Sequence, residues 1–263
     1  MKNLRKYGKS PYTVAVIHGG PGAPGEMAAV ARELSLLTGI LEPLQTKSTL
    51  EEQVEELKEV LEESSNIPII LIGHSWGAWL AYILTARYPA LVKKLILIAS
   101  GAFEEKYAVS IMTNRLSRLS EDEREEVLNL MVKFENPGDE DMDKLFSRFG
   151  EFMIKTDSFS LLPVDNVDKE VLKTDYDINQ TVWKQAHEMR ISGELLEMGK
   201  KIECPVLAIH GDYDPHLAEG VEAPLSRVIK DLKFVLLPKC GHYPWKERHA
   251  RDAFYDILKQ EVR

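Results

Sequence analysis

Short apolar segments alternate with segments of helical period along most of the chain. The apolar segments have the length and the β-branched content of buried strands, and they lie at residues 12–17, 40–44, 68–72, 94–99, 205–210 and 233–237. The segments of helical period lie at residues 26–37, 49–63, 76–88, 222–229 and 246–259. Strands that alternate with helices in this way predict an α/β fold, with a mostly parallel sheet flanked by helices on both faces.

The clearest helix prediction is residues 49–63. Glutamates cover one face, and apolar residues repeat at helical spacing on the other, at Leu50, Val54, Leu57 and Leu61. Ser48 or Thr49 can cap the start of this helix, because a glutamate follows each of them three residues later.

The pattern changes between residues 103 and 201, where no segment has the character of a buried strand. Helical spacing is found there at residues 110–119, 121–134, 142–154 and 182–198. Loops of this length are uncommon inside a compact domain, so these residues predict an inserted helical lid. The expected domains are a core formed by residues 1–102 and 202–263 and a lid, or cap, formed by residues 103–201.

The composition narrows the classes of function. The chain has 263 residues and a formal net charge of −9, and this acidic balance argues against binding to nucleic acid or to an anionic membrane surface. No apolar segment approaches the roughly 20 residues that cross a bilayer. Residues 12–17 are too few for a secretory signal, and the two cysteines imply no disulfide framework. These features predict a cytoplasmic protein.

The most informative motif joins the apolar segment 68–72 to the helix that follows it. Residues 73–77 read Gly-His-Ser-Trp-Gly, so glycines stand two residues before and two residues after Ser75. A turn this tight strains the backbone and brings neighbouring chain segments close together, and glycine tolerates both. The hydroxyl of Ser75 would lie at the start of a helix, where amide groups stabilise negative charge. This arrangement is typical of the nucleophile of a serine hydrolase.

A serine nucleophile needs a histidine base within hydrogen-bond reach and a carboxylate that orients the histidine. In open α/β sheets such groups follow the carboxyl ends of the strands. Asp212 and Asp214 follow one predicted strand, and His242 follows the next. The chain therefore supplies a serine, an acid and a histidine in that order.

Four ordered blocks resemble the α/β-hydrolase fold family: residues 18–22 (His-Gly-Gly-Pro-Gly), 73–77, 211–214 (Gly-Asp-Tyr-Asp) and 241–242 (Gly-His). The resemblance covers the chain from residue 12 to its end, except for the lid. It implies that Ser75 is the nucleophile, His242 the general base and Asp214 the orienting acid. Asp212 is the alternative acid, because it lies closer to the end of the strand, but the family spacing Gly-x-x-Asp favours Asp214.

An oxyanion hole needs two aligned backbone donors. The resemblance assigns one donor to the amide of Trp76, the residue after the nucleophile, and the other to the loop 18–22, with Gly20 as the expected donor. Pro21 has no amide to offer. The side chain of His18 is expected to hold this loop by hydrogen bonds.

A metal site is the alternative interpretation of residues 210–216. Its ligands would be the four alternating side chains His210, Asp212, Asp214 and His216. On an extended strand these side chains would share one face. Gly211 and Pro215 interrupt such a strand, so neither a metal nor another cofactor is expected.

The chain departs from the family at its N-terminus. Most members have two strands before the one that leads to the oxyanion loop, whereas about ten residues precede residue 12 here. We therefore expect an N-terminally shortened sheet whose exposed edge strand must be covered or paired, and a homo-oligomer is possible.

The resemblance implies a carboxylesterase-like serine hydrolase that cleaves a small ester or amide through an acyl-enzyme, with a small molecule or short peptide as substrate. The blocks 18–22 and 73–77 also resemble proline iminopeptidases, so an aminopeptidase is the alternative function. Such enzymes hold the amine of the substrate with lid carboxylates, and the candidates here are Glu104, Glu105, Asp157, Asp175 and Glu188. A non-enzymatic binding protein on the same fold is the third hypothesis.

Overall fold

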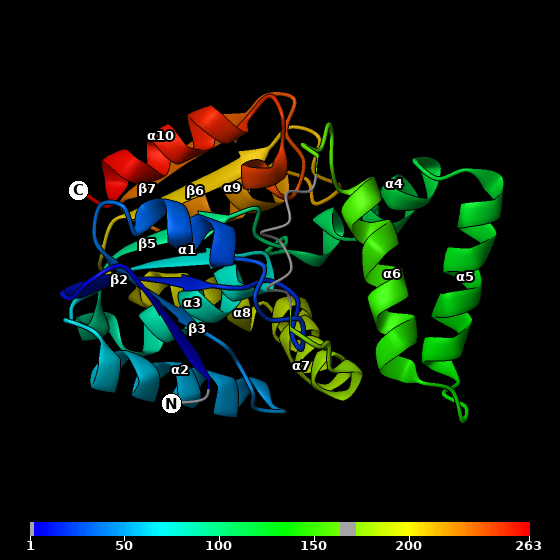
Figure 1. Ribbon diagram of the computed structural model, residues 1–263, viewed down its shortest axis with the longest axis horizontal. Coiled ribbons are helices and arrows are strands. Elements are labelled where there is room, and N and C mark those ends of the chain that lie inside the picture. The colour runs from blue at the N-terminus through cyan, green and yellow to red at the C-terminus, as the bar shows by residue number, and fades with distance from the viewer. Residues whose placement is uncertain (1–2, 164–171) are drawn as a thin grey trace.

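The computed structural model describes residues 3–163 and 172–263 and contains a seven-stranded sheet in the order β1-β3-β2-β4-β5-β6-β7 (Figure 1). The strands are β1 (Leu4–Tyr7), β2 (Tyr12–Ile17), β3 (Gly39–Pro43), β4 (Ile69–His74), β5 (Val92–Ile98), β6 (Val206–Gly211) and β7 (Leu232–Leu237). β1 is antiparallel to β3, and all the other neighbouring strands are parallel. The predicted α/β class and the mostly parallel sheet are confirmed.

Helices cover both faces of this sheet (Figure 1). α1 (Ala28–Leu34) and α10 (Arg251–Glu261) pack on one face, while α2 (Leu50–Ser64), α3 (Trp76–Arg87) and α9 (Glu219–Val228) pack on the other. Successive residues of a central strand point into opposite cores: Leu71 packs on the α3 side, and Ile72 packs on the α1 side. Because both faces are buried, the central strands are apolar throughout.

α2 begins at the residue that its capping signal predicts. The hydroxyl of Thr49 accepts a hydrogen bond from the amide of Glu52 at 3.3 Å and donates one to the Glu52 carboxylate at 2.8 Å. Thr49, rather than Ser48, is therefore the cap. The four predicted apolar positions of this helix are buried in the core on the α3 side of the sheet.

The N-terminal edge of the sheet holds a strand that the hydrophobic pattern does not predict. β1 pairs with β3 from Leu4 opposite Pro43 to Tyr7 opposite Ile40. The Tyr7 hydroxyl also donates to the buried carboxylate of Glu42 at 2.7 Å. Half of the residues of β1 are charged, so its sequence does not have the pattern of a strand. The segment is extended because it pairs with β3.

The segment between β5 and β6 is helical in its described part. It contains α4 (Ile111–Ser117), α5 (Glu121–Glu135), α6 (Met142–Thr156), α7 (Tyr176–Ser192) and α8 (Glu194–Glu197). The part of the predicted lid at residues 164–171 lies outside the described residues. The boundaries 103–201 of the lid stay a prediction.

α7 differs from the helix predicted at residues 182–198. It begins six residues earlier, because the Asp175 carboxylate caps it by accepting from the amide of Ile178 at 2.9 Å. It ends at Gly193, whose φ of 81° is left-handed. With 17 residues, α7 is a long helix. Within residues 3–163 and 172–263, however, no helix has both the length and the hydropathy that a membrane span requires.

The lid helices attach to the rest of the chain in two ways. α7 packs into the core on the α3 side through Val182 and Ala186, and the ring of Trp183 stacks on Trp79 with centroids 5.6 Å apart. α5 and α6 lie side by side away from the sheet (Figure 1) and share a separate small apolar cluster. The cluster consists of Leu119, Val127, Leu130, Phe152 and Met153. The α5–α6 pair contacts α7 through the rings of Phe134 and Phe146, whose centroids lie 5.4 and 6.1 Å from that of Tyr176.

Candidate active site

Ser75 lies in the sharp turn between β4 and α3. Its backbone has φ 52° and ψ −114°, a conformation that non-glycine residues adopt only under strain. A Cβ on Gly73 would lie 2.2 Å from the carbonyl oxygen of Gly77, and a Cβ on Gly77 would lie 2.4 Å from that of His18. The two glycines are thus needed for close backbone approach, while the strain falls on the serine itself.

Gly77→Ala is therefore expected to destabilise the fold by about 3 kcal/mol or more, because backbone oxygens cannot move aside for the new methyl group. Urea unfolding measures the effect. The matched control is Gly150→Ala in the interior of α6, where a Cβ meets nothing within 4 Å. Removing a helical glycine there should stabilise the protein by roughly 0.5–1 kcal/mol. Equal stabilities for the two variants would contradict the packing described for the turn.

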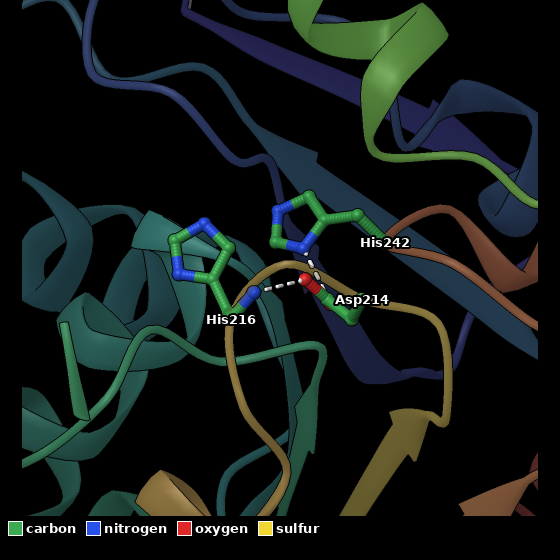
Figure 2. Close-up of side chains that lie close together, drawn as sticks. All are labelled: Asp214, His216 and His242. Atoms are coloured by element: carbon green, nitrogen blue, oxygen red, sulfur yellow. Dashed lines mark hydrogen bonds and ion pairs between the residues drawn. The ribbon is translucent and has the colours of Figure 1, made fainter. Parts of the chain in front are cut away.

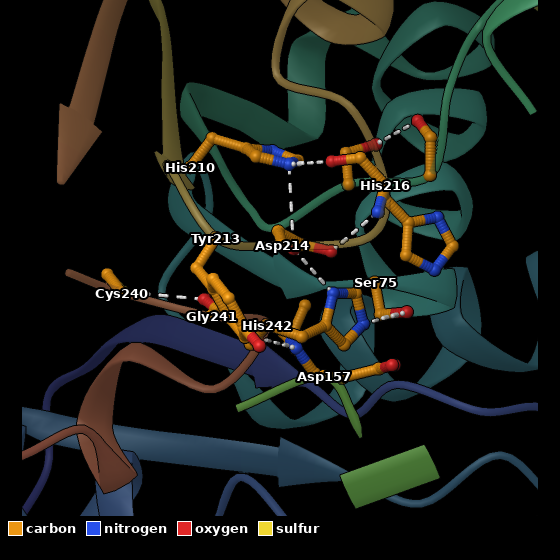
Figure 3. Close-up of polar contacts among 12 residues, drawn as sticks. Ser75, Asp157, His210, Tyr213, Asp214, His216, Cys240, Gly241 and His242 are labelled. Carbon is orange, nitrogen blue, oxygen red and sulfur yellow. Dashed lines mark hydrogen bonds and ion pairs between the residues drawn. The ribbon is translucent and has the colours of Figure 1, made fainter. Parts of the chain in front are cut away.

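The structure brings Ser75, His242 and Asp214 together in one hydrogen-bonded chain (Figure 3). His242 Nε2 lies 2.9 Å from Ser75 Oγ, and His242 Nδ1 lies 2.7 Å from Asp214 Oδ2. Asp214 follows β6, and His242 follows β7, so both residues stand beyond the carboxyl ends of their strands. Side chains 167 residues apart in sequence meet because parallel strands end at the same edge of the sheet.

The charges within this chain of side chains favour proton transfer from the serine. Burial disfavours the ionised form of Asp214, but the charges of His242 and His210 outweigh burial and hold its pKa well below the ordinary value. Burial also lowers the pKa of His242, and the charge and hydrogen bond of Asp214 outweigh it and raise that pKa. Because the carboxylate accepts the Nδ1 proton of His242, Nε2 faces Ser75 as the proton acceptor.

Asp212, the alternative acid, has a different place. Its carboxylate accepts a hydrogen bond from the amide of Cys240 at 3.2 Å, which ties together the loops after β6 and β7. Asp214 has its second oxygen engaged by the amide of His216 at 2.9 Å, so its orientation toward His242 is fixed from both sides. Of the two aspartates, Asp214 is the one that contacts the histidine.

Asp214, His216 and His242 form a compact group whose potential ligand atoms lie within 4.8 Å of one another (Figure 2). Their geometry does not suit a metal ion. The two imidazole rings stack with centroids 4.8 Å apart and planes 22° apart, and the lone pairs of an imidazole lie in its ring plane, so they cannot converge on one ion. In addition, Arg115 donates to His216 Nε2 at 3.2 Å. The group is better described as the packed surroundings of the Asp214 carboxylate.

The loop after β2 packs against the turn that contains Ser75. A Cβ on Gly19 would lie 3.0 Å from the Cβ of Ser75, so this loop packs directly against the turn. His18 Nδ1 lies 2.8 Å from the carbonyl oxygen of Gly19, and His18 Nε2 lies 3.4 Å from the amide of Gln45. His18 thus holds the loop by hydrogen bonds, as predicted.

The same contact orients the amide of Gly20. In a trans peptide the N–H points away from the C=O, so an Nδ1–H bond to the Gly19 carbonyl turns the Gly20 N–H to the opposite side. Trp76 begins α3, where the first amides have no partner within the helix. In the described ranges neither amide donates to another main-chain group. Their assignment as oxyanion donors stays a prediction.

Two arginines of the α4 region connect the lid to the loops of the site, and nothing in the sequence pattern singled them out. Arg115 donates twice to Asp157, whose main-chain oxygen accepts the amide of His242 at 2.7 Å (Figure 3). Arg118 donates to the main-chain oxygen of Tyr213 at 2.9 Å and lies 3.8 Å from the centre of its ring. The sequence shows only that the two arginines are three residues apart, a spacing that places both on one face of a helix.

Glu247 is a further residue that the sequence did not reveal. It is fully buried, and its carboxylate accepts three main-chain amides at 2.7 to 2.9 Å. The donors are Phe159, Ser160 and Gly241. Glu247 therefore joins the segment after α6 to the residue that precedes His242. In the sequence this residue lies within the helix predicted at residues 246–259, and no motif includes it.

The lid carboxylates considered as amine ligands already have partners, with one exception. Glu104 pairs with Arg227, Glu105 with Arg190, Asp157 with Arg115, and Asp175 caps α7. Glu188 lines a surface groove of about 590 Å³ together with residues of α2 and the end of α3. That end of α3 lies about 18 Å from Ser75 by the rise of the helix. None of the five is therefore positioned as a free carboxylate beside Ser75.

Comparison with known proteins agrees with this architecture. The family model described as alpha/beta hydrolase fold matches residues 38–248. A proline iminopeptidase of Saccharolobus solfataricus is 24% identical over 273 aligned positions, which cover 95% of this chain and 84% of the relative.

Two solved structures share the fold over nearly the whole chain. VinJ has a TM-score of 0.71 at 15% identity, covering 98% of this chain and 93% of its own. The monoacylglycerol lipase of Paleococcus ferrophilus has a TM-score of 0.63 at 15% identity, covering 98% of this chain and 97% of its own. With the family match over most of its length, this chain belongs to the α/β-hydrolase fold family.

Proposed function

We propose that the protein is a serine hydrolase that cleaves a small carboxylic ester through an acyl-enzyme intermediate. The observation that carries this proposal is the hydrogen-bonded chain from Ser75 Oγ through His242 to Asp214. Ser75 Oγ attacks the ester carbonyl while its proton passes to His242 Nε2. Asp214 stays ionised and stabilises the imidazolium that forms.

The negative charge of the tetrahedral intermediate falls on the former carbonyl oxygen. The amides of Gly20 and Trp76 receive this oxygen, and together they supply the two donors of an oxyanion hole. The intermediate collapses when His242 returns its proton to the leaving alcohol. Water then repeats the sequence on the acyl-enzyme, with His242 again as the base, and releases the acid and Ser75.

An ester is favoured over an N-terminal amino acid amide because recognition of a free amine requires an available carboxylate. The lid carboxylates near the site are engaged, above all Asp157, which Arg115 neutralises with two hydrogen bonds. A proline iminopeptidase-like aminopeptidase is the second candidate. It is favoured by the relative from Saccharolobus solfataricus, whose similarity spans 95% of this chain.

Hydrolysis of p-nitrophenyl esters of increasing acyl length, compared with hydrolysis of prolyl-naphthylamide, tests the proposal. We expect kcat/KM for the best ester to exceed kcat/KM for the prolyl amide by about 100-fold or more. Because p-nitrophenol is the better leaving group, an alkyl ester of the same acid is used to correct this ratio. A preference for the prolyl amide would replace the first candidate by the second.

The rate of ester cleavage should depend on pH through His242. Its pKa lies above the ordinary value near 6.5, because the Asp214 carboxylate outweighs burial. A protonated imidazole cannot take the proton of Ser75, so kcat/KM is low in acid, rises through this pKa, and reaches half its plateau above pH 6.5. A profile measured from about pH 5 to 10 with a slowly cleaved ester checks this. A flat profile would remove His242 from the role of base.

A further inference from the structure

Glu26 and His74 form a buried pair beside Ser75 that the proposed mechanism does not use. His74 is the last residue of β4, and its side chain is 1% exposed. Its Nδ1 contacts the carboxylate of Glu26, and its Nε2 lies 2.9 Å from the main-chain oxygen of His242. The same Glu26 oxygen accepts the amide of Gly19 at 2.6 Å. The pair thus contacts the loop 18–22 and the residue proposed as the base, and His74 itself directly precedes Ser75.

The two partners of His74 determine where its protons lie. A carbonyl oxygen only accepts, so Nε2 carries the proton that it shares with His242. A carboxylate also only accepts, so Nδ1 must carry a proton as well. A ring with both protons is an imidazolium, and a neutral histidine has one donor and cannot serve both acceptors.

Glu26 is suited to be the counter-ion. Burial alone would raise its pKa, but the charge and hydrogen bond of His74 outweigh burial, and Lys246 adds to the effect, so that the pKa falls to about 2. The ring of His74 also lies near three other rings: Trp245 at 4.7 Å, His242 at 4.8 Å and Tyr243 at 5.3 Å between centroids. Burial lowers the pKa of the nearby His18 ring, which disfavours a positive charge there. No second carboxylate contact of His74 is found in the described ranges.

We propose that Glu26 and His74 are positioning residues that hold the oxyanion loop, Ser75 and His242 in register through one buried imidazolium–carboxylate pair. Glu26 fixes the Gly19 amide, and with it the peptide that leads to Gly20. His74 fixes the carbonyl of His242 from the strand that carries Ser75. The kinetic consequence rests on the proposed function, whereas the existence of the charged pair does not.

Glu26→Gln removes the charge and keeps the shape of the side chain. An uncharged amide cannot stabilise the buried imidazolium, so one of the two hydrogen bonds of His74 is lost. The loops that carry Gly19 and His242 are then held less firmly relative to Ser75. We expect kcat for an ester to fall about 10- to 100-fold with KM changed less than about 3-fold, since misplacement of reacting groups acts on the chemical step. The matched control is Glu33→Gln on α1, whose partner is Lys259 near the surface. It should behave as wild type.

Histidine NMR of the intact protein with isotope-labelled rings gives a readout that packing alone would not produce. One ring should carry protons on both nitrogens, because both nitrogens of His74 face hydrogen-bond acceptors. That signal should disappear in His74→Asn, which assigns it, and in Glu26→Gln. His74→Asn keeps a donor near the Nδ1 position, so it preserves the contact with Glu26 while removing the charge.

These experiments test separately whether the Glu26–His74 pair is charged and whether it positions the residues of the site. A singly protonated His74 ring in the wild-type protein overturns the charged pair, and this result needs no substrate and no foldable Glu26 variant. A charged pair with Glu26→Gln kinetics equal to those of Glu33→Gln overturns the positioning role. Absence of any Ser75-dependent hydrolysis would instead overturn the proposed function and leave the NMR result standing on its own.

Discussion

Ser75→Ala is expected to reduce kcat for ester hydrolysis on the order of 10⁶-fold, to the detection limit of most assays. The variant loses the only atom that forms the acyl-enzyme, so no other group of the site can complete the first step. Substrate binding should change little, because the hydroxyl contributes a single contact. Steady-state rates with a p-nitrophenyl ester, at enzyme concentrations high enough to exclude trace wild type, measure the effect.

The strained backbone at Ser75 also leads to a prediction about the stability of Ser75→Ala. Alanine adopts φ near 52° no more readily than serine, so the fold should keep its stability within about 1 kcal/mol. Ser100→Ala is the matched control, since Ser100 is also buried and follows the neighbouring strand β5, but its hydroxyl donates to the main-chain oxygen of Gly101. Loss of activity in Ser100→Ala, or activity retained in Ser75→Ala, would contradict the assignment of the nucleophile.

Asp214→Asn is expected to reduce kcat roughly 10⁴-fold. The amide can donate to His242 Nδ1 and thereby favour the tautomer in which Nε2 carries the proton, so that the ring no longer accepts from Ser75. Loss of the carboxylate also removes the charge that raises the pKa of His242, and the remaining activity should therefore shift to lower pH. The measurement is the pH profile of kcat/KM for both proteins.

Asp212→Asn provides a control of the same chemistry two residues away. Among residues 3–163 and 172–263, its side chain accepts only the Cys240 amide, a contact that the oxygen of asparagine can keep, so activity should stay within about 3-fold of wild type. If Asp212→Asn rather than Asp214→Asn abolished activity, the acid would be assigned to the wrong residue. Circular dichroism and urea unfolding of both variants exclude loss of fold as the cause.

The fold was predictable because its signals are local. Strands buried on both faces are continuous apolar runs, and the helices on the two faces have clear periods, so each element could be recognised without its neighbours. The turn around Ser75 was equally readable, since close backbone approach requires glycine at residues 73 and 77. β1 was not, because an edge strand with charged residues looks like a loop until its pairing partner is known.

The contacts around the site could not be predicted, since they join residues that are distant in the sequence. Glu26 and His74 are 48 residues apart, and Glu247 binds amides 87 and 88 residues before it. A buried charge and a solvated charge have the same sequence signature, and only the structure tells which carboxylates are engaged. For the same reason the lid acids appeared to be amine ligands, although four of the five have partners.

The most direct test of the central claim is covalent labelling with a fluorophosphonate, followed by mass spectrometry of the modified peptide. The account predicts one adduct, on the serine between His74 and Trp76, that is absent in Ser75→Ala and slowed strongly in Asp214→Asn. Folded wild-type protein that takes up no label, or a label that persists at another serine in Ser75→Ala, would contradict it and favour a binding protein built on this fold.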